Sequence, residues 1–164
     1  MKQEYKEAMT RKGVTLIELI IVMVIIAIGA ALMVPNIGGW MHHYRLRSAA
    51  RDVVSVMRTA QIKAVSHNLP YGVAFDTGAQ EFQLYRDSGG LQPDGASNGF
   101  PTGVTFNIVS FPVDGTLNKH FVSFFPDSTA SDDGTIVLTN KTKGVQRTRT
   151  VQVSKSTGRI KLIE

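Results

Sequence analysis

Hydrophobic residues are concentrated in one block near the beginning of the chain. From Leu19 to Val34 nearly every residue is Leu, Ile, Val, Met or Ala, and no residue between Glu18 and Arg45 carries a formal charge. A helix needs about 20 apolar residues to cross the hydrocarbon core of a bilayer. The block therefore predicts a hydrophobic, membrane-spanning helix over residues 14–40.

Beyond Trp40 the pattern changes to one apolar position every third or fourth residue, which places the apolar side chains in one stripe along a helix. The stripe consists of Leu46, Ala50, Val53, Met57, Ala60 and Ala64. Pro70 ends the pattern, because the residue before a proline is pushed away from helical angles. Residues 41–69 are thus predicted to form an amphipathic helix that packs on a sheet. Pro35 is predicted to bend the hydrophobic helix before it.

From Tyr71 onward, short runs with strand periodicity alternate with turn residues. Residues 77–80 are predicted to close a hairpin, and the glycines and prolines of residues 87–103 predict a long irregular loop. The predicted fold is α+β, with a long N-terminal helix packed on an antiparallel β-sheet head over residues 70–164. Strands are expected at residues 71–76, 81–86, 104–111, 120–126, 135–140, 149–154 and 159–163.

Composition narrows the functional classes. The length of 164 residues fits one domain with an appendage, and the absence of cysteine excludes disulfides, thiolate catalysis and cysteine-bound zinc. The formal net charge is +5, and after Thr139 the only acidic residue is Glu164. A basic surface of this kind favours phosphate groups or acidic neighbouring subunits, although it also suits a solvated sheet face.

No catalytic pattern is present, because the sequence lacks a Ser-His-Asp arrangement, a His-Glu-x-x-His motif and a glycine-rich phosphate loop. We therefore expect neither enzymatic activity nor a cofactor. His42 and His43 are adjacent and would point about 100° apart on a helix, which favours a polar surface over a metal pair. Asp127, Asp132 and Asp133 lack the spacing of a calcium loop and are typical of turns. No metal site is predicted.

The N-terminus invites two other interpretations. A basic stretch before an apolar run fits a secretory signal peptide, but this run exceeds the roughly 7–15 residues of a signal core and no Ala-x-Ala site follows it. An ordinary single-span anchor, with Glu18 reaching the headgroups, is the second alternative. It leaves Gly13 unexplained, and a carboxylate in lipid is costly unless it has a partner.

The segment from Arg11 to Leu19, RKGVTLIEL, resembles the processing site of type IV prepilins and type II secretion pseudopilins. The resemblance implies that prepilin peptidase cuts between Gly13 and Val14, removes residues 1–13 as a leader and methylates the new amino terminus of Val14. Most family members have phenylalanine where this chain has Val14. Glu18 is implied to pair with the amino terminus of a neighbouring subunit during assembly, a pairing that strengthens as the local dielectric falls.

The same resemblance implies where the protein acts and with what. It implies a bacterial inner-membrane protein with one span and a periplasmic head, which enters a filament after assembly. The implied partners are prepilin peptidase, other pilin or pseudopilin subunits, the inner-membrane assembly platform and the membrane itself.

Residues 124–130, 134–138 and 151–160 resemble the pseudopilin H and FimT-like subset, whose members act as minor subunits that prime or cap a filament. The GRIK sequence at residues 158–161 resembles a Gly-Arg-x-Arg element of DNA-binding FimT-like minor pilins, with lysine in place of the last arginine. Two functions thus stay open: a structural subunit of a type IV pilus or type II secretion pseudopilus, and a DNA-binding minor pilin for natural transformation. The candidate DNA-binding residues are Arg147, Arg149, Arg159 and Lys161.

Overall fold

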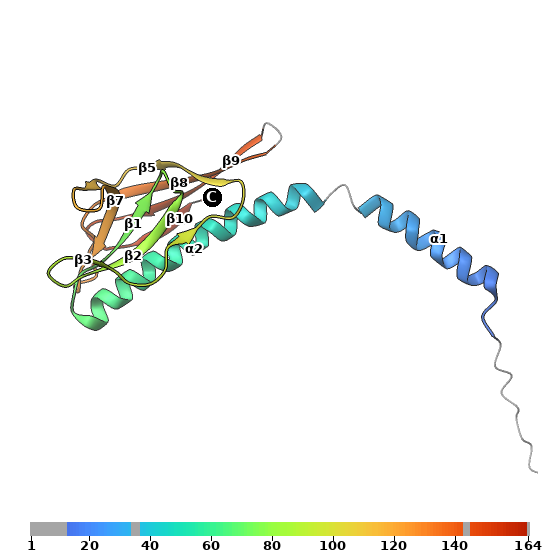
Figure 1. Cartoon of the computed structure of the whole chain (residues 1–164), viewed down its shortest axis with the longest axis horizontal. Coiled ribbons are helices and arrows are strands. Elements are labelled where there is room, and N and C mark those ends of the chain that lie inside the picture. Colours follow the sequence, from blue (N-terminus) through green and yellow to red (C-terminus); the bar gives the residue numbers. More distant parts are fainter. Residues whose placement is uncertain (1–12, 34–36, 143–144, 164) are drawn as a thin grey trace, which may run out of the picture. The chain divides into compact units, whose positions relative to one another are not determined.

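A computed structural model describes residues 13–33, 37–142 and 145–163 of the chain. They belong to two compact units, Met1–Gly38 and Gly39–Glu164 (Figure 1). The first unit contains helix α1 (Leu16–Met33), and the second contains most of helix α2 (Ile37–His67) and all of the strands. Pro35 lies outside the described residues, so the predicted bend at this position stays a prediction.

Helix α1 is apolar on every side. Its Leu, Ile, Val and Met side chains from Leu16 to Ile28 are exposed, with between 47% and 78% of each residue accessible. Among the described residues, no helix is both long and apolar enough to span a membrane. A helix that is hydrophobic all round is normally covered by other apolar groups. Among the described residues of its own unit, α1 has no such cover.

Helix α2 buries the predicted stripe. All six of its residues, from Leu46 to Ala64, are at most 2% accessible, and Ala49 is also fully buried. Most of these side chains are small, which lets the strands approach the helix axis closely. The helix ends where Asn68 adopts a left-handed φ of 53° and the amide of Leu69 donates to the carbonyl of Ala64. The amphipathic helix is therefore confirmed.

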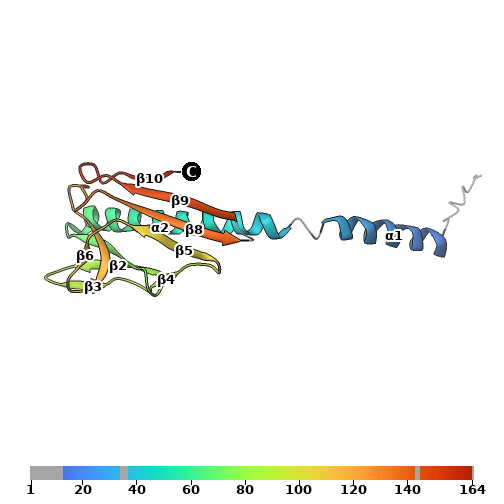
Figure 2. The same ribbon diagram turned by 90° about the horizontal axis from the view of Figure 1, so that it is seen from above.

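The strands form two antiparallel sheets, which lie along α2 in both views of the head (Figure 2). The first has the order β3-β2-β1-β7-β6, with β4 also paired to β2, and the second has the order β10-β9-β8-β5. The first sheet consists of β1 (Tyr71–Asp76), β2 (Glu81–Asp87), β3 (Leu91–Pro93), β4 (Asn98–Gly99), β6 (Val113–Asp114) and β7 (Lys119–Phe124). The second consists of β5 (Val104–Val109), β8 (Gly134–Thr142), β9 (Val145–Val153) and β10 (Ile160–Ile163).

The predicted α+β fold is confirmed, with one correction in the head. Residues 87–103 do not form an irregular loop throughout, because β3 and β4 lie within them and both pair with β2. Strand β6 is also additional and pairs with β7. These strands are two or three residues long, too short for an alternating pattern, and they depend on hydrogen bonds to a longer neighbour.

The core of the head lies between α2 and both sheets. Phe75 of β1 packs against Phe106 and Phe111, with ring centroids 6.0 and 5.9 Å apart. Ile136, Leu138, Val151 and Val153 complete the cluster from the second sheet. Full burial of such side chains contributes roughly 1.5–3 kcal/mol each. Every member of the cluster lies at or after Leu46, so the head has a core that α1 does not share.

Candidate functional sites

The predicted assembly residue, Glu18, is part of a hydrogen-bonded cap at the start of α1. Its Oε2 atom accepts hydrogen bonds from the backbone amide and the hydroxyl of Thr15, both at 3.0 Å. The amide of Glu18 in turn donates to the Thr15 hydroxyl at 3.4 Å. A threonine before the first turn with a glutamate three residues later is a capping box, which satisfies amides that the helix itself leaves unpaired.

The predicted cleavage site lies just before this cap. Gly13 and Val14 are outside any helix or strand, and both are exposed. A Cβ atom placed on Gly13 would meet no atom within 4 Å. The peptide bond between them is therefore accessible, and nothing in the described chain requires glycine at this position.

Arg147 and Arg149 of β9 lie on the side of the second sheet that faces α2. They alternate along the strand with the same phase as the buried Val151 and Val153. The Nη1 atom of Arg147 is 2.8 Å from Nδ1 of His43 on α2. These two candidate DNA-binding residues thus belong to the helix side of the sheet.

Arg159 and Lys161 occupy a different surface. Lys161 lies between Ile160, which is buried, and Leu162, which packs against the core, so its side chain points to the opposite face of the sheet. With Gln152 and two hydroxyl residues, Arg159 and Lys161 line a shallow depression of about 340 Å³. The four candidate residues therefore form two pairs on two surfaces and do not make one continuous patch.

Gly158, which precedes Arg159, has a structural role that the sequence analysis missed. Its φ is +57°, and a Cβ atom there would collide with the carbonyl oxygen of Ser128. The Nε2 atom of Gln61 on α2 donates to that carbonyl at 3.1 Å and to the carbonyl of Gly158 at 3.4 Å. In the sequence, this contact is indicated only by the position of Gln61, directly after Ala60 of the apolar stripe.

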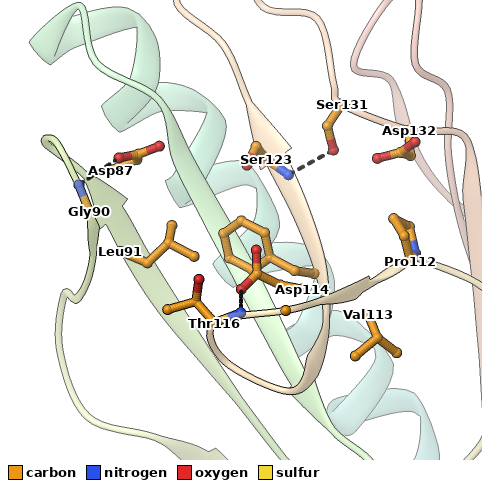
Figure 3. Close-up of a pocket in the computed structure, with 12 residues that line it drawn as sticks. Asp87, Gly90, Leu91, Pro112, Val113, Asp114, Thr116, Ser123, Ser131 and Asp132 are labelled. Atoms are coloured by element: carbon orange, nitrogen blue, oxygen red, sulfur yellow. Dashed lines mark hydrogen bonds between the residues drawn. The ribbon is translucent and has the colours of Figure 1, made fainter.

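A pocket of about 520 Å³ opens between the β2–β3 and β6–β7 turns (Figure 3). It combines apolar side chains with three aspartates, Asp87, Asp114 and Asp132. Two of the carboxylates stabilise turns: Asp87 accepts from the amide of Gly90 at 3.1 Å, and Asp114 accepts from the amides of Thr116 and Leu117 at 2.8 and 2.9 Å. These hydrogen bonds explain their position without a ligand.

Two of the three aspartates considered from the sequence, Asp127 and Asp133, are similarly occupied. Asp127 accepts hydrogen bonds from the amide and hydroxyl of Thr129, which hold the pKa of its carboxyl below the ordinary value. Asp133 accepts from the amide of Lys155 at 2.8 Å. In the part of the chain that the structure describes, no group of three or more His, Cys, Asp or Glu residues could hold a metal ion.

Comparison with known proteins first defines the class. The chain is similar to a structure of the minor pseudopilin EpsH from the type 2 secretion system of Vibrio cholerae. Their TM-score is 0.58 at 12% identity, covering 73% of this chain and 96% of that one. The type IV minor pilin FimU of Pseudomonas aeruginosa is similar with a TM-score of 0.57 at 18% identity, covering 76% and 92% of the two chains. At these identities the likeness establishes the pilin fold.

The sequence then defines the family. The chain belongs to the family of the type II transport protein GspH, which matches residues 49–157. Residues 8–34 match the prokaryotic N-terminal methylation motif. No curated protein sequence matches the chain significantly. The predicted resemblance to pilins and pseudopilins is confirmed, and the family and fold are those of structural subunits that form filaments.

Proposed function

We propose that this protein is a minor pseudopilin or pilin that prepilin peptidase cuts between Gly13 and Val14 and methylates at Val14. Its apolar N-terminal segment holds the subunit in the inner membrane, with the head in the periplasm. An assembly platform then moves the subunit into a filament of a type II secretion system or type IV pilus. The observation that carries this proposal is α1, which has an exposed apolar surface all round and one charged residue, Glu18.

Glu18 can cap α1 before assembly and pair with a neighbouring subunit during assembly. Both hydrogen bonds from Thr15 end on Oε2. Among the described residues, Oε1 accepts no hydrogen bond, so it is free to accept one from the ammonium group of a neighbouring subunit. An apolar bundle of helices strengthens such a pair because the dielectric is low there. The carboxylate therefore sets the register in which subunits join.

Three variants separate charge pairing from helix capping. Glu18→Gln keeps an acceptor for the cap but removes the charge. Thr15→Ala removes the hydroxyl of the cap and keeps the charge and the backbone amide that donates to Glu18. Glu18→Ala removes both the acceptor and the charge. We expect all three to be processed, Thr15→Ala to enter filaments, and both Glu18 variants to be reduced at least tenfold in sheared filaments, measured by immunoblotting. Normal incorporation of Glu18→Gln would contradict charge-guided assembly.

Processing is tested at Gly13. A Cβ atom at this position meets nothing in the described chain, so any effect of Gly13→Ala on cleavage arises from the contact of residue 13 with the peptidase. We expect the variant to accumulate as an uncut precursor, identified by intact mass and N-terminal sequencing. Thr10→Ala, a substitution inside the leader that leaves Gly13 in place, is the matched control and should be cut normally. Cleavage of both variants after residue 13 at the wild-type rate would refute the assignment.

DNA uptake is the second candidate function, and the exposed pair of Arg159 and Lys161 favours it. No acidic residue lies between Gly134 and Ile163, so nothing in this part of the chain offsets their charge. One stretch of DNA would contact this pair without Arg147 and Arg149, which lie on the other face. In a gel-shift assay at low salt, replacing Arg159 and Lys161 with alanine should abolish DNA binding. Replacing Arg147 and Arg149 with alanine should not. Absence of binding by the wild-type protein would end this proposal.

A further inference from the structure

Basic side chains gather at the end of the head where α2 begins. They come from two elements: Arg45 and Arg47 lie on α2, and three others lie on the hairpin of β8 and β9, which projects from the head (Figure 1). We call Arg45, Arg47, Lys141, Arg147 and Arg149 the basic collar. None of the five belongs to the depression lined by Arg159 and Lys161.

Two contacts hold the collar together. The Nη1 atom of Arg147 lies 2.8 Å from Nδ1 of His43, which fixes the hairpin against the first turns of α2. The Nη1 atom of Arg45 donates to the carbonyl of Thr102 at 3.5 Å, which connects the same part of α2 to the segment before β5. The collar therefore joins α2 and the hairpin at one end of the head, although its residues are about 100 positions apart in the sequence. Arg147 and Arg149 face α2, whereas Lys141, which pairs with Gln146, points to the opposite side of the same hairpin.

The collar has charge of one sign only. No acidic residue occurs from Ile37 to Arg51, or from Gly134 to Ile163, and the first acid on α2 is Asp52. Arg47, Lys141 and Arg147 are exposed, and Arg45 and Arg149 are partly exposed. Four of the five residues are arginines, whose planar guanidinium groups bind phosphate oxygens in pairs. The surface thus fits a partner that presents many phosphates.

The position of the collar in the chain indicates which phosphates it meets. Arg45 and Arg47 follow Met33, the last residue of α1, by 12 and 14 positions in the sequence. The collar is therefore joined to the end of the hydrophobic helix through a short segment of chain.

We propose that the basic collar binds anionic phospholipid headgroups and docks the head on the membrane surface while the subunit waits for assembly. This inference rests on the proposed membrane stage and adds a partner to it. Juxtamembrane Lys and Arg residues are attracted to anionic leaflets over about a Debye length, near 8 Å at physiological ionic strength. Docking would hold the head in one orientation, so that α1 is presented to the filament in a defined way.

The test uses the full chain in lipid nanodiscs. The protein has no cysteine, so one introduced cysteine gives a specific fluorescent label. We choose Thr148→Cys on the exposed hairpin and, as a control, Thr116→Cys in the exposed β6–β7 turn, which is outside the collar. With a quencher on the lipid headgroups, quenching at position 148 should be at least threefold stronger in phosphatidylglycerol than in phosphatidylcholine discs and should disappear at 1 M salt. Position 116 should be unaffected.

Matched variants identify the surface. Arg147→Gln with Arg149→Gln should abolish the lipid-dependent quenching, whereas Arg159→Gln with Lys161→Gln removes the same charge from the other face and should preserve it. Arg47→Gln with Lys141→Gln is a second collar pair, chosen because neither residue makes a hydrogen bond or ion pair in the described structure. This pair should weaken quenching at least twofold without changing the circular dichroism spectrum.

The possible results distinguish a failure of the collar proposal from a failure of the proposed membrane stage on which it rests. A chain that fails to insert into discs of either lipid contradicts the proposed membrane stage. Insertion with equal quenching in both lipids, or equal effects of the two matched pairs, overturns the collar. Displacement of the hairpin from phosphatidylglycerol discs by an equimolar concentration of duplex DNA would show that the collar is a nucleic-acid site, and it would likewise overturn lipid docking.

Discussion

At the scale of single residues, Glu18 can cap its own helix and, in the proposed assembly, also pair with a neighbouring chain. Its hydrogen bonds with Thr15 supply partners to the first amides of α1, and a capping interaction of this type is typically worth about 1 kcal/mol. Both bonds use one oxygen atom, which leaves the second for a neighbouring chain. Assembly therefore does not have to break the cap.

Asp76 provides a residue whose effect on stability should depend on pH. The amide of Ala79 donates to its carboxylate at 2.8 Å, and the Nζ atom of Lys119 lies 3.1 Å away. The first of these hydrogen bonds and then the interaction with Lys119 lower the pKa of Asp76 below its ordinary value of 3.8. Because the folded-state pKa is the lower one, the stabilisation is complete above about pH 5 and is lost as the pH falls through the folded-state pKa.

Asp76→Asn tests this contribution, because asparagine keeps an acceptor for the turn but loses the charge. We expect the variant to be less stable than the wild type by about 1 kcal/mol or less at pH 7, as is usual for a partly exposed ion pair. The difference in free energy of unfolding, measured by urea denaturation at several pH values, should shrink towards zero near pH 3. A difference that stays constant from pH 7 to pH 3 would contradict the assignment.

At the scale of elements, α2 is the part of the molecule that brings the two sheets together. Its buried face, the stripe together with Ala49, contains four alanines as well as larger residues, which allows strands of both sheets to contact one helix face. Gln61 lies beside this face and donates to the carbonyl of Ser128, in the segment after β7, and to the carbonyl of Gly158, in the turn before β10. The close approach of that turn to the Ser128 carbonyl is what requires glycine at position 158.

Gly158→Ala should therefore destabilise the head. A left-handed φ costs a residue with a Cβ atom about 1–2 kcal/mol, and the collision with the Ser128 carbonyl adds to this. We expect a loss of roughly 2–4 kcal/mol in the free energy of unfolding, measured by urea denaturation with an unchanged slope. Gly115→Ala is the matched control, since a Cβ atom there meets nothing within 4 Å, and it should change stability by less than about 0.5 kcal/mol.

At the scale of the whole molecule, the two units differ in how their apolar residues are covered. The first unit has an apolar helix with no core of its own, whereas the second has a contiguous core that starts at Leu46. A unit that buries its apolar residues internally can fold before assembly, and a helix that exposes them needs lipid or neighbouring helices. This division is what a subunit that changes its surroundings requires.

The independence of the head can be tested by truncation. A chain of residues 41–164 should unfold cooperatively, with a melting temperature within about 3 °C of that of the head in the full-length protein in detergent. Differential scanning calorimetry measures both. A chain of residues 51–164 is the control: it lacks the buried Leu46, Ala49 and Ala50 and should melt at least 10 °C lower. A head that needs residues 13–40 for cooperative unfolding would contradict the division into units.

Sequence periodicity by itself determined the local elements. The stripe on α2 and the longer strands follow from rules that involve residues a few positions apart, and the structure confirms them. The apolar block forms helix α1 from Leu16 to Met33, and its predicted role as a membrane span stays a prediction. The processing motif is also local. Thr15 and Glu18 also stand at capping-box spacing in the sequence.

Only the tertiary structure decided which surfaces these elements share. The face that Arg147 or Lys161 occupies depends on strand register, and a shift by one residue would exchange the two faces. The short strands β3, β4 and β6 form by pairing with β2 and β7, and local pattern could not predict them. The contacts of Arg147 with His43 and of Gln61 with the turn at Gly158 join segments about 100 residues apart. Local rules therefore predicted this protein's parts, and long-range packing determined how its charged residues are grouped.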